Sequence, residues 1–340
     1  MSQNSVPVID IEPFLKGTQA GKTAVARQLD AACLETGFFS ILGHGIPESL
    51  TRNTRDLSAA FFGLPMDEKN KSLPAKRAPR GYSPPGTRSL AYTREGVEAP
   101  PDLQESFAVG PLDPGAAPSD ANPIVTGFFA PNIWPAQPAG FEPTMSAYFQ
   151  AMSGLADTIM RIFANALGVK ETFFTDKIDR HPSVLRLTYY PAQKTAPLPG
   201  QVRSGEHTDY GDLTILRGDD VPGGLPVQTR DGKWMDVHPV PGSFVCNIGD
   251  LMMRWTNDYW VSTPHRVVNP PREYAHQDRI SLVFFHMPNH DAVIRCIENR
   301  AEHAVKYPPI SCADYFASKY LRSELQKTQV DTSKEVIVTR

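Results

Sequence analysis

Hydrophobic residues recur at a spacing of three to four positions in four stretches of the chain. These stretches cover residues 23–35, 47–62, 144–167 and 312–325. Residues three and four apart share one face of an α-helix, so each stretch is predicted to be a helix with one apolar face. Gly37 follows the first stretch and marks its end. The third stretch is the longest and predicts a helix that supports a hydrophobic core.

After residue 167 the spacing changes to short β-prone runs separated by Gly, Pro and Asp. The runs are VLRLTYY, DLTILR, LPVQTR, FVCNIG, HRVV and RISLVFFHM. A succession of this kind is typical of a jelly roll or barrel. Near the N-terminus, VPVIDI and residues 38–42 predict two further strands among the predicted helices. We therefore expect an α/β region followed by a mainly β protein with flanking helices.

Proline and glycine are concentrated between residues 75 and 143. The whole chain has 32 prolines in 340 residues, which disfavours a long helical bundle. We interpret this segment as long ordered loops over a surface rather than as a linker between domains. The predicted organisation is an N-terminal α/β region packed on the core (1–120), a helix with the jelly roll (121–305), and a C-terminal helix and tail (306–340).

Composition and charge narrow the range of partners. The chain has 34 Lys and Arg against 37 Asp and Glu, a net charge of -3, which argues against a nucleic-acid partner. It shows neither a leader-like N-terminus nor an apolar run long enough to span a bilayer. Its four cysteines form no CxxC pair, which favours a reducing compartment. We expect a cytoplasmic protein, by default a monomer, whose partner is a small molecule.

Two His-x-Asp pairs are candidates for binding a metal. They are His207 with Asp209, and His276 with Asp278. Residues i and i+2 of an extended strand project from the same face, so either pair could reach one ion. The first pair precedes a clear strand, whereas the second lies in a polar segment after two prolines. We therefore select His207 and Asp209 as candidate ligands.

A third ligand and a carboxylate-binding pair lie further along the chain. His265 stands at the entrance of the run HRVV. Two histidines and one carboxylate on one face of an ion leave three positions open, which is characteristic of non-haem Fe(II) oxygenases. Arg279 and Ser281 alternate on the run RISLVFF and therefore share a face. An arginine fork beside a hydroxyl suits a carboxylate held in a partly dry site.

Taken together, these motifs resemble a known family. The segments LRLTYYP, GEHTDYGDLTIL, GGLPVQTRDGKWMDV, NIGDLMMRWTNDYWVSTPHRVV and DRISLVFFHMPNHD resemble the isopenicillin N synthase-like branch of the Fe(II)/2-oxoglutarate-dependent dioxygenases. The N-terminal segments VPVIDI, ACLETGFFSILGHGIP and RGYSPPG resemble the same branch. The resemblance spans residues 5 to 300 and only loosely covers the C-terminal tail.

The resemblance implies a double-stranded β-helix, or jelly roll, in which the two histidines and the aspartate selected above bind Fe(II). It also assigns Arg279, Ser281 and Tyr190 to the distal carboxylate of 2-oxoglutarate. Thr188 stands where plant members of the family often have Asn. This difference affects one expected contact near the co-substrate.

The implied activity is that of a dioxygenase that uses O2 and 2-oxoglutarate to oxidise a small organic molecule. Hydroxylation is expected, with desaturation or ring closure as further outcomes, and succinate and CO2 are released. Three alternatives remain open at this point. The chain could be an oxidase of the isopenicillin N synthase type that does not use 2-oxoglutarate, an ethylene-forming enzyme that fragments 2-oxoglutarate, or a non-catalytic jelly-roll binding protein.

The motifs do not name the substrate, because side chains in variable loops determine it. By resemblance, Tyr82 and Phe107 lie in segments that approach the mouth of the site, and we predict that they contact the substrate. Phe285 is predicted to line the same pocket. For Phe284 and Trp255 a core position is the leading interpretation, and an apolar wall that excludes water is the alternative.

Overall fold

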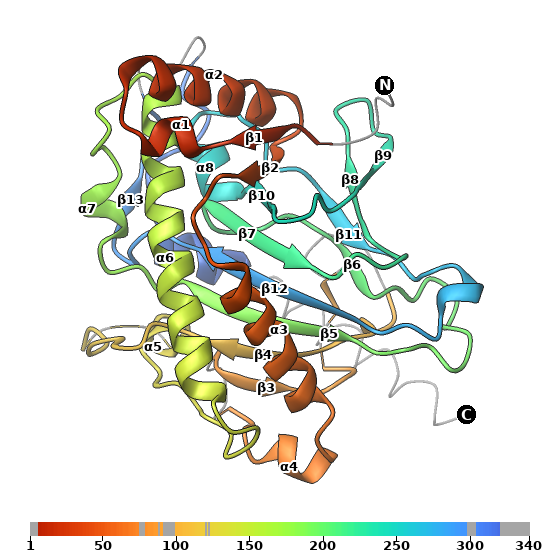
Figure 1. The fold of residues 1–340 in the computed structure, drawn as a ribbon. Helices are drawn as coiled ribbons and strands as arrows, with labels where there is room; N and C mark the ends of the chain where they lie inside the picture. Colours follow the sequence, from red (N-terminus) through yellow and green to blue (C-terminus); the bar gives the residue numbers. More distant parts are fainter. Residues whose placement is uncertain are drawn as a thin grey trace, which may run out of the picture.

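Two β-sheets face each other in the computed structural model of the chain (Figure 1). The structure describes residues 6–74, 79–87, 89–90, 99–119, 121, 123–297 and 304–319. The larger sheet has eight strands in the order β1-β2-β10-β7-β12-β5-β4-β3. Their bounds are β1 Val8–Asp10, β2 Phe38–Leu42, β3 Gly81–Ser83, β4 Glu105–Val109, β5 Val184–Tyr190, β7 Leu213–Gly218, β10 Phe244–Ile248 and β12 Arg279–His286. Apart from the parallel pair β1 and β2, neighbouring strands are antiparallel.

The smaller sheet supplies the opposite wall of the jelly roll. It has four antiparallel strands in the order β6-β11-β8-β9. These strands are β6 Ser204–His207, β8 Leu225–Gln228, β9 Trp234–Val237 and β11 His265–Val267, and a separate ribbon joins β13 Val293–Ile294 to β14 Ile310–Ser311. A jelly-roll core in a mainly β protein with helices, as predicted, is confirmed.

Helices cover the outer face of the larger sheet, where α3 and α6 run across β5, β7 and β12 (Figure 1). The helices are α1 Glu12–Leu15, α2 Gln19–Glu35, α3 Glu48–Phe62, α4 Met66–Asn70, α5 Pro123–Phe128, α6 Phe141–Ala166, α7 Thr175–Ile178 and α8 Asp250–Trp255, with a short 3-10 helix at Arg272–Tyr274. No helix among the described residues is long and apolar enough to cross a membrane.

Three of the four predicted helices are found over nearly their predicted lengths, as α2, α3 and α6. The fourth is described only in part, because residues 312–319 are helical and the remainder lies outside the described residues. The Pro- and Gly-rich segment differs from the prediction of loops alone. It contains β3, β4 and α5, and β4 pairs with β5 over five residues. Short strands at the edge of a sheet are stabilised by such pairing more than by their own composition.

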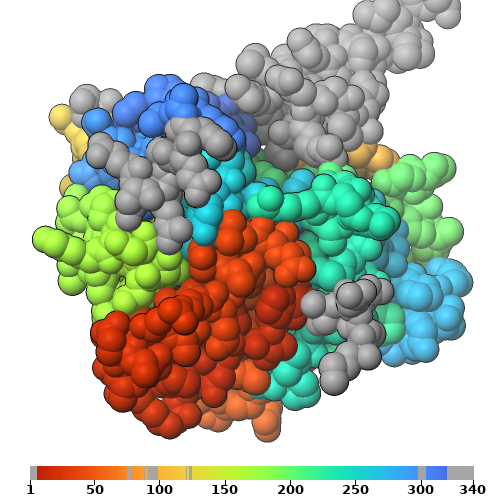
Figure 2. All heavy atoms as spheres, turned by 90° about the horizontal axis from the view of Figure 1, so that it is seen from above, coloured from red at the N-terminus to blue at the C-terminus, as the bar shows by residue number. Residues whose placement is uncertain are grey.

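Strands from the N-terminal part of the chain extend the larger sheet at both ends. β2 pairs with β10 on one side, and β4 pairs with β5 on the other. From above, Figure 2 shows the red N-terminal residues bordered by the yellow-green of residues 150–175 and by the teal of the jelly-roll strands. The N-terminal part and the jelly roll therefore share one sheet and one core.

The main hydrophobic core lies between the larger sheet and its helices. α6 contributes thirteen buried residues to it, including Met152, Ile159 and Phe163. A second, smaller cluster lies between the two sheets and contains Val227 and Val267 from the smaller sheet. The space between the sheets is therefore only partly filled by apolar side chains.

Helix α2 holds the loop that precedes β11. Asp30 of α2 accepts hydrogen bonds from the Trp260 indole, 2.8 Å away, and the Tyr259 hydroxyl, 3.1 Å away. Thr263 in the same loop donates to the backbone carbonyl of Thr36, just after α2. All three hydrogen bonds come from residues just before His265, so the N-terminal region helps to position the first residue of β11.

Candidate active site

A cavity opens between the two sheets. The side chains that line it come from both sheets and from one segment before β4. They are Leu90, Gln104, Arg186, Thr188, Tyr190, Ser204, His207, Asp209, Thr214, Leu216, Leu225, Asn247, His265, Val267, Arg279, Ser281, Val283 and Phe285. This set includes all the predicted metal ligands and all the predicted 2-oxoglutarate contacts.

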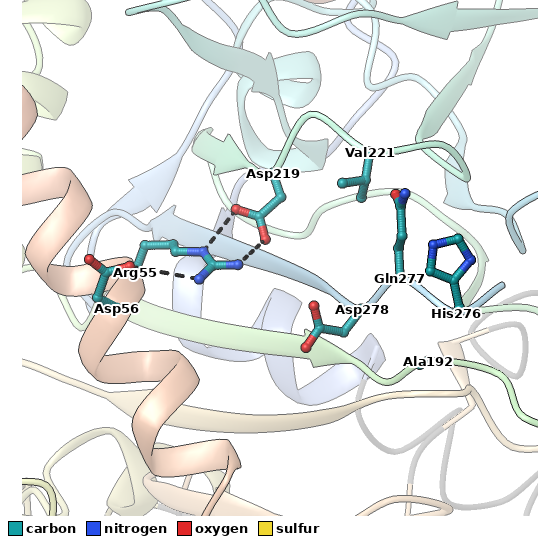
Figure 3. A pocket seen from close by; sticks show the side chains of 8 residues that line it. All are labelled: Arg55, Asp56, Ala192, Asp219, Val221, His276, Gln277 and Asp278. Carbon is teal, nitrogen blue, oxygen red and sulfur yellow. Dashed lines mark hydrogen bonds and ion pairs between the residues drawn. The ribbon is translucent and has the colours of Figure 1, made fainter. Parts of the chain in front are cut away.

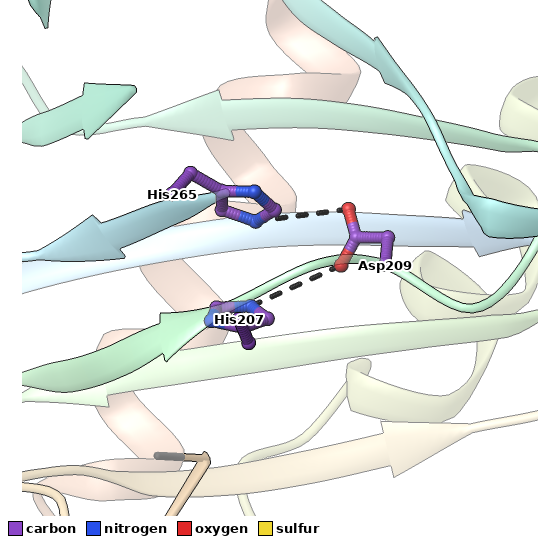
Figure 4. A group of neighbouring side chains, drawn as sticks. All are labelled: His207, Asp209 and His265. Atoms are coloured by element: carbon purple, nitrogen blue, oxygen red, sulfur yellow. Dashed lines mark ion pairs between the residues drawn. The ribbon is translucent and has the colours of Figure 1, made fainter. Parts of the chain in front are cut away.

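His207, Asp209 and His265 converge at one point in this cavity (Figure 4). His207 ends β6 and His265 begins β11, and the two residues are directly paired across the antiparallel strands. Asp209 Oδ1 lies 3.9 Å from His207 Nε2, and Asp209 Oδ2 lies 3.8 Å from His265 Nε2. One ligand atom from each residue lies within 4.8 Å of the other two, which is close enough to share one metal ion.

The backbone orients both imidazole rings. His207 Nδ1 lies 2.7 Å from the carbonyl of Gly205, and His265 Nδ1 lies 3.0 Å from the carbonyl of Thr263. A carbonyl only accepts, so each Nδ1 carries the proton and each Nε2 keeps its lone pair. Burial, together with the charge of His265, lowers the pKa of His207, which favours the neutral form that binds metal.

Asp209 is held as a carboxylate by its neighbours. Its Oδ2 accepts hydrogen bonds from Thr214 Oγ1 and Asn247 Nδ2, each at 2.7 Å. Burial alone would raise the pKa of Asp209, but the two imidazoles and these donors outweigh it, and the pKa is lowered. The group of three residues therefore combines two neutral nitrogen donors with one anionic oxygen donor.

Arg279, Ser281 and Tyr190 gather at another part of the cavity. Arg279 is directly opposite Tyr190 in the pairing of β12 with β5, and its guanidinium carbon lies 5.6 Å from the Tyr190 ring centroid. The guanidinium also donates to the Ser281 hydroxyl. Thr188, the position that differs from plant members, pairs with Ser281 and also lines the cavity. These residues offer a carboxylate one cation and several hydroxyl groups.

The surroundings of Arg279 fit an anionic ligand. Arg279 is 4% exposed, and its Nε has no hydrogen-bond partner among the described residues. Burial lowers the pKa of Arg279, which means that its charge is poorly solvated. A Cβ on Gly218 would lie 2.5 Å from Arg279 Nη2, so only glycine leaves room for the guanidinium. A bound carboxylate would supply both the missing acceptor and the missing negative charge.

The alternation of side chains along the larger sheet separates the cavity from the core. On β12, Arg279, Ser281, Val283 and Phe285 line the cavity, whereas Phe284 packs in the core on the other face. Successive side chains of a strand point to opposite faces, which explains this division.

Tyr82 and Phe107 are not among the residues that line the cavity, and both pack in the core. Phe107 pairs with Leu187, whose side chain faces the core, and packs edge to face against Phe61 and Phe141 at centroid distances of 4.9 and 5.1 Å. Tyr82 is fully buried, and its hydroxyl donates to Glu105. Their positions in β3 and β4 put both rings on the helix-covered face. Trp255 also packs in the core.

Other histidines and acids also lie away from the metal ligands. His276 and Asp278 line a surface pocket with Arg55 (Figure 3). Asp278 accepts a hydrogen bond from the Tyr189 hydroxyl, so the second His-x-Asp pair takes no part in the cavity. His286 is buried beside Asp212, with Nδ1 2.8 Å from Oδ1.

Several residues that support the site were not predicted. Thr214 and Asn247 orient Asp209, and Arg186 and Gln104 line the cavity. For Arg186 the sequence does contain a signal, because in LRLTYY it alternates with Thr188 and Tyr190. Asn247 carries no such signal, since its contact depends on the pairing of β10 with β7.

A jelly roll with two histidines and one aspartate beside a buried arginine defines the class of non-haem iron oxygenases. Two family models match the chain, one described as the N-terminal region of a non-haem dioxygenase in morphine synthesis over residues 6–137, and the 2OG-Fe(II) oxygenase superfamily over residues 181–288. The chain therefore belongs to the Fe(II)/2-oxoglutarate-dependent oxygenase family, in its isopenicillin N synthase-like branch. It is an oxidoreductase that uses Fe(II), 2-oxoglutarate and O2.

Individual relatives cover nearly the whole chain. Homoarginine-6-hydroxylase 2-ODD-233 of Oryza sativa subsp. japonica is 33% identical over 332 residues, which cover 93% of this chain and 97% of the relative. Validamycin A dioxygenase of Streptomyces hygroscopicus subsp. limoneus is 31% identical, with 83% and 76% covered. A full-length Neurospora crassa protein, solved in complex with alpha-KG and thymine, superposes with a TM-score of 0.80 at 31% identity, covering 97% of this chain and 98% of that one.

Replacing Gly218 by alanine should weaken the binding of 2-oxoglutarate. The new Cβ would collide with Arg279, so we expect the KM for 2-oxoglutarate to rise roughly tenfold, which corresponds to about 1.4 kcal/mol. Steady-state kinetics of succinate formation measures this change. Gly224→Ala is the matched control, because a Cβ there meets open space. An unchanged KM in Gly218→Ala would contradict the assignment of Arg279.

Replacing Phe107 by alanine should destabilise the fold without changing the site. A buried Phe→Ala change typically lowers the free energy of unfolding by about 3–5 kcal/mol, and Phe107 is fully buried. Urea unfolding measures the loss, and calorimetry checks that the folded variant still binds 2-oxoglutarate. Phe285→Ala serves as the comparison, because its half-buried ring should contribute less to stability. Equal losses in the two variants would contradict this division between core and cavity.

Proposed function

We propose that His207, Asp209 and His265 hold the catalytic Fe(II) in an oxygenase that hydroxylates a small organic molecule. The observation that carries this proposal is their convergence on one point from paired strands, with both Nε2 atoms directed inward. The backbone carbonyls of Gly205 and Thr263 accept hydrogen bonds from the two rings and so hold each Nε2 in the orientation that binds a metal.

Arg279, Ser281 and Tyr190 are proposed to bind the distal carboxylate of 2-oxoglutarate. The guanidinium fork and the Ser281 hydroxyl offer donors on the same face of β12. Bound Fe(II) and 2-oxoglutarate together activate O2 for the oxidation of a C–H bond, with release of succinate and CO2. The chain's own part is to orient these groups and to exclude water, to which Phe285 contributes an apolar wall.

The relatives favour this function over an oxidase that does not use 2-oxoglutarate. In such an oxidase Arg279 would hold a carboxylate of the substrate instead. Relatives that cover most of this chain are named hydroxylases or 2-oxoglutarate oxidoreductases, and the Neurospora crassa protein was solved with alpha-KG. We further propose that the protein is a monomer and works in the cytoplasm. The buried thiols of Cys33, Cys246 and Cys312, which form no disulfide, support a reducing compartment.

An anaerobic titration tests the proposed ligands. Adding Fe(II) and then 2-oxoglutarate to the metal-free protein should produce a weak visible charge-transfer band that requires both additions. Admitting air should then release succinate slowly even without a substrate. His207→Ala should abolish the band and the succinate, because one of three metal ligands is lost.

His276→Ala is the matched control, because it removes the histidine of the second His-x-Asp pair, outside the cavity. It should leave the band intact. A full band in His207→Ala would refute the proposed ligand set. Tight Fe(II) binding by the unmodified protein with no band on adding 2-oxoglutarate would favour the oxidase.

A further inference from the structure

A second arginine, Arg186, lines the cavity away from Arg279. It lies on β5 and shares the cavity face with Thr188 and Tyr190. Its guanidinium carbon lies 5.1 Å from the centroid of the Phe285 ring. Both side chains are only partly buried, although they stand on a sheet face that is otherwise largely covered. An arginine stacked on an aromatic ring keeps its in-plane donors directed outward.

The register of β5 and β12 separates the two arginines along the cavity. Arg279 pairs with Tyr190, and Arg186 pairs with Val283. Four residues of extended strand separate Arg279 from Val283, a distance of roughly 13 Å. Arg186 and the proposed metal ligands line the same cavity. A five-carbon diacid is shorter than this backbone separation, which leaves Arg186 to bind another molecule.

We propose that Arg186 and Phe285 recognise the molecule that is oxidised, and that this molecule is a small carboxylic acid with a flat or apolar carbon skeleton. The assignment rests on the proposed function of the site. The guanidinium would bind the carboxylate through paired hydrogen bonds. Phe285, Val283 and Leu90 would pack against the carbon skeleton, and the Gln104 amide adds a polar group to the lining.

Matched pairs of acids and amides test this assignment. Protein loaded anaerobically with Fe(II) and 2-oxoglutarate is titrated with benzoate and benzamide, phenylacetate and phenylacetamide, and hexanoate and hexanamide. Binding is followed by calorimetry and by the change in the visible band. At least one acid should bind about tenfold more tightly than its amide, because only the acid can pair with the guanidinium.

Variants test whether Arg186 causes the preference for the acid over its amide. Arg186→Gln should reduce the preference for the acid to about twofold or less, with Arg186→Lys between the two, while the affinity for 2-oxoglutarate stays within about twofold. Arg254→Gln is the matched control, because Arg254 also stacks on an aromatic ring, 4.5 Å from the Tyr307 centroid, but outside the cavity. It should keep the preference.

Two results would overturn the assignment. One is that no acid in the panel binds better than its amide, and the other is that the preference survives in Arg186→Gln. Absence of the visible band before any acid is added would instead overturn the proposed function on which the assignment rests. The band and the acid preference therefore separate the two failures.

A different observation concerns the outer face of the same sheet. Arg55 of α3 binds Asp219 in a bidentate ion pair, with Nε 3.1 Å from Oδ1 and Nη2 3.0 Å from Oδ2 (Figure 3). Asp219 follows Gly218 at the end of β7. Its Oδ2 also accepts a hydrogen bond from the backbone amide of Ile280, at 2.9 Å, and its own amide donates to the Ile280 carbonyl, also at 2.9 Å.

Ile280 stands between Arg279 and Ser281, so Asp219 holds the backbone from which both of these side chains project. We infer that Asp219, held by Arg55, is a positioning residue for the 2-oxoglutarate carboxylate. Through this ion pair, helix α3 supports the part of the cavity that contains Arg279 and Ser281. This inference also rests on the proposed role of Arg279.

The test separates positioning from general stability. Asp219→Ala should raise the KM for 2-oxoglutarate about fivefold or more, while kcat of uncoupled succinate formation changes by about twofold or less. Asp219→Asn should restore part of the affinity, because its amide oxygen can still accept from Ile280. Arg55→Gln should raise the KM for 2-oxoglutarate less than Asp219→Ala does.

Glu48→Gln is the matched control. Glu48 joins the same helix to the same strand through Arg217, at 3.0 Å, but does not contact Ile280. This variant should leave the KM for 2-oxoglutarate unchanged. It shows the effect of losing an ion pair between α3 and β7 that does not involve Ile280. Equal effects in Glu48→Gln and Asp219→Ala, or a loss confined to kcat, would overturn the inference.

Discussion

The antiparallel pairing of β6 with β11 is the constraint on which the site depends. It sets His207 directly opposite His265, and it brings together residues that are 58 positions apart in the chain. The hydrogen bonds of both rings to backbone carbonyls then leave the Nε2 atoms directed at Asp209. A shift of one residue in this register would turn one histidine to the other face of the sheet. The placement of the two histidines in the proposed metal site is therefore a consequence of sheet geometry.

Alternation along the larger sheet organises the remainder of the molecule. One face of β5 and β12 presents Arg279, Ser281 and Arg186 to the cavity, and the other face presents leucines and phenylalanines to α3 and α6. The same strands thus contribute side chains to both the polar cavity and the hydrophobic core. Rigid packing on the helix side keeps the polar side chains in place before any ligand binds, which reduces the entropy that binding must overcome.

Much of this arrangement could be predicted from the sequence, because it depends on local periodicity. The helices α2, α3 and α6 and the pair Arg279 with Ser281 follow from spacing within one element. The pair His207 with Asp209 follows from close spacing across the end of β6. Tyr82 and Phe107 lie in the core and not in the cavity, because the face on which a ring lies depends on the register of β3 and β4, which the sequence does not encode locally. Asn247 and Asp219 were missed for a related reason, since their contacts join segments far apart in the chain.

A crystal structure of the protein with Fe(II) and 2-oxoglutarate, grown without O2 and measured at the iron absorption edge, tests the central claim most directly. The account predicts one anomalous peak bounded by His207 Nε2, His265 Nε2 and an Asp209 oxygen, with the distal carboxylate of 2-oxoglutarate on Arg279 and Ser281. Iron bound elsewhere, or a 2-oxoglutarate carboxylate held by Arg186 instead of Arg279, would contradict it.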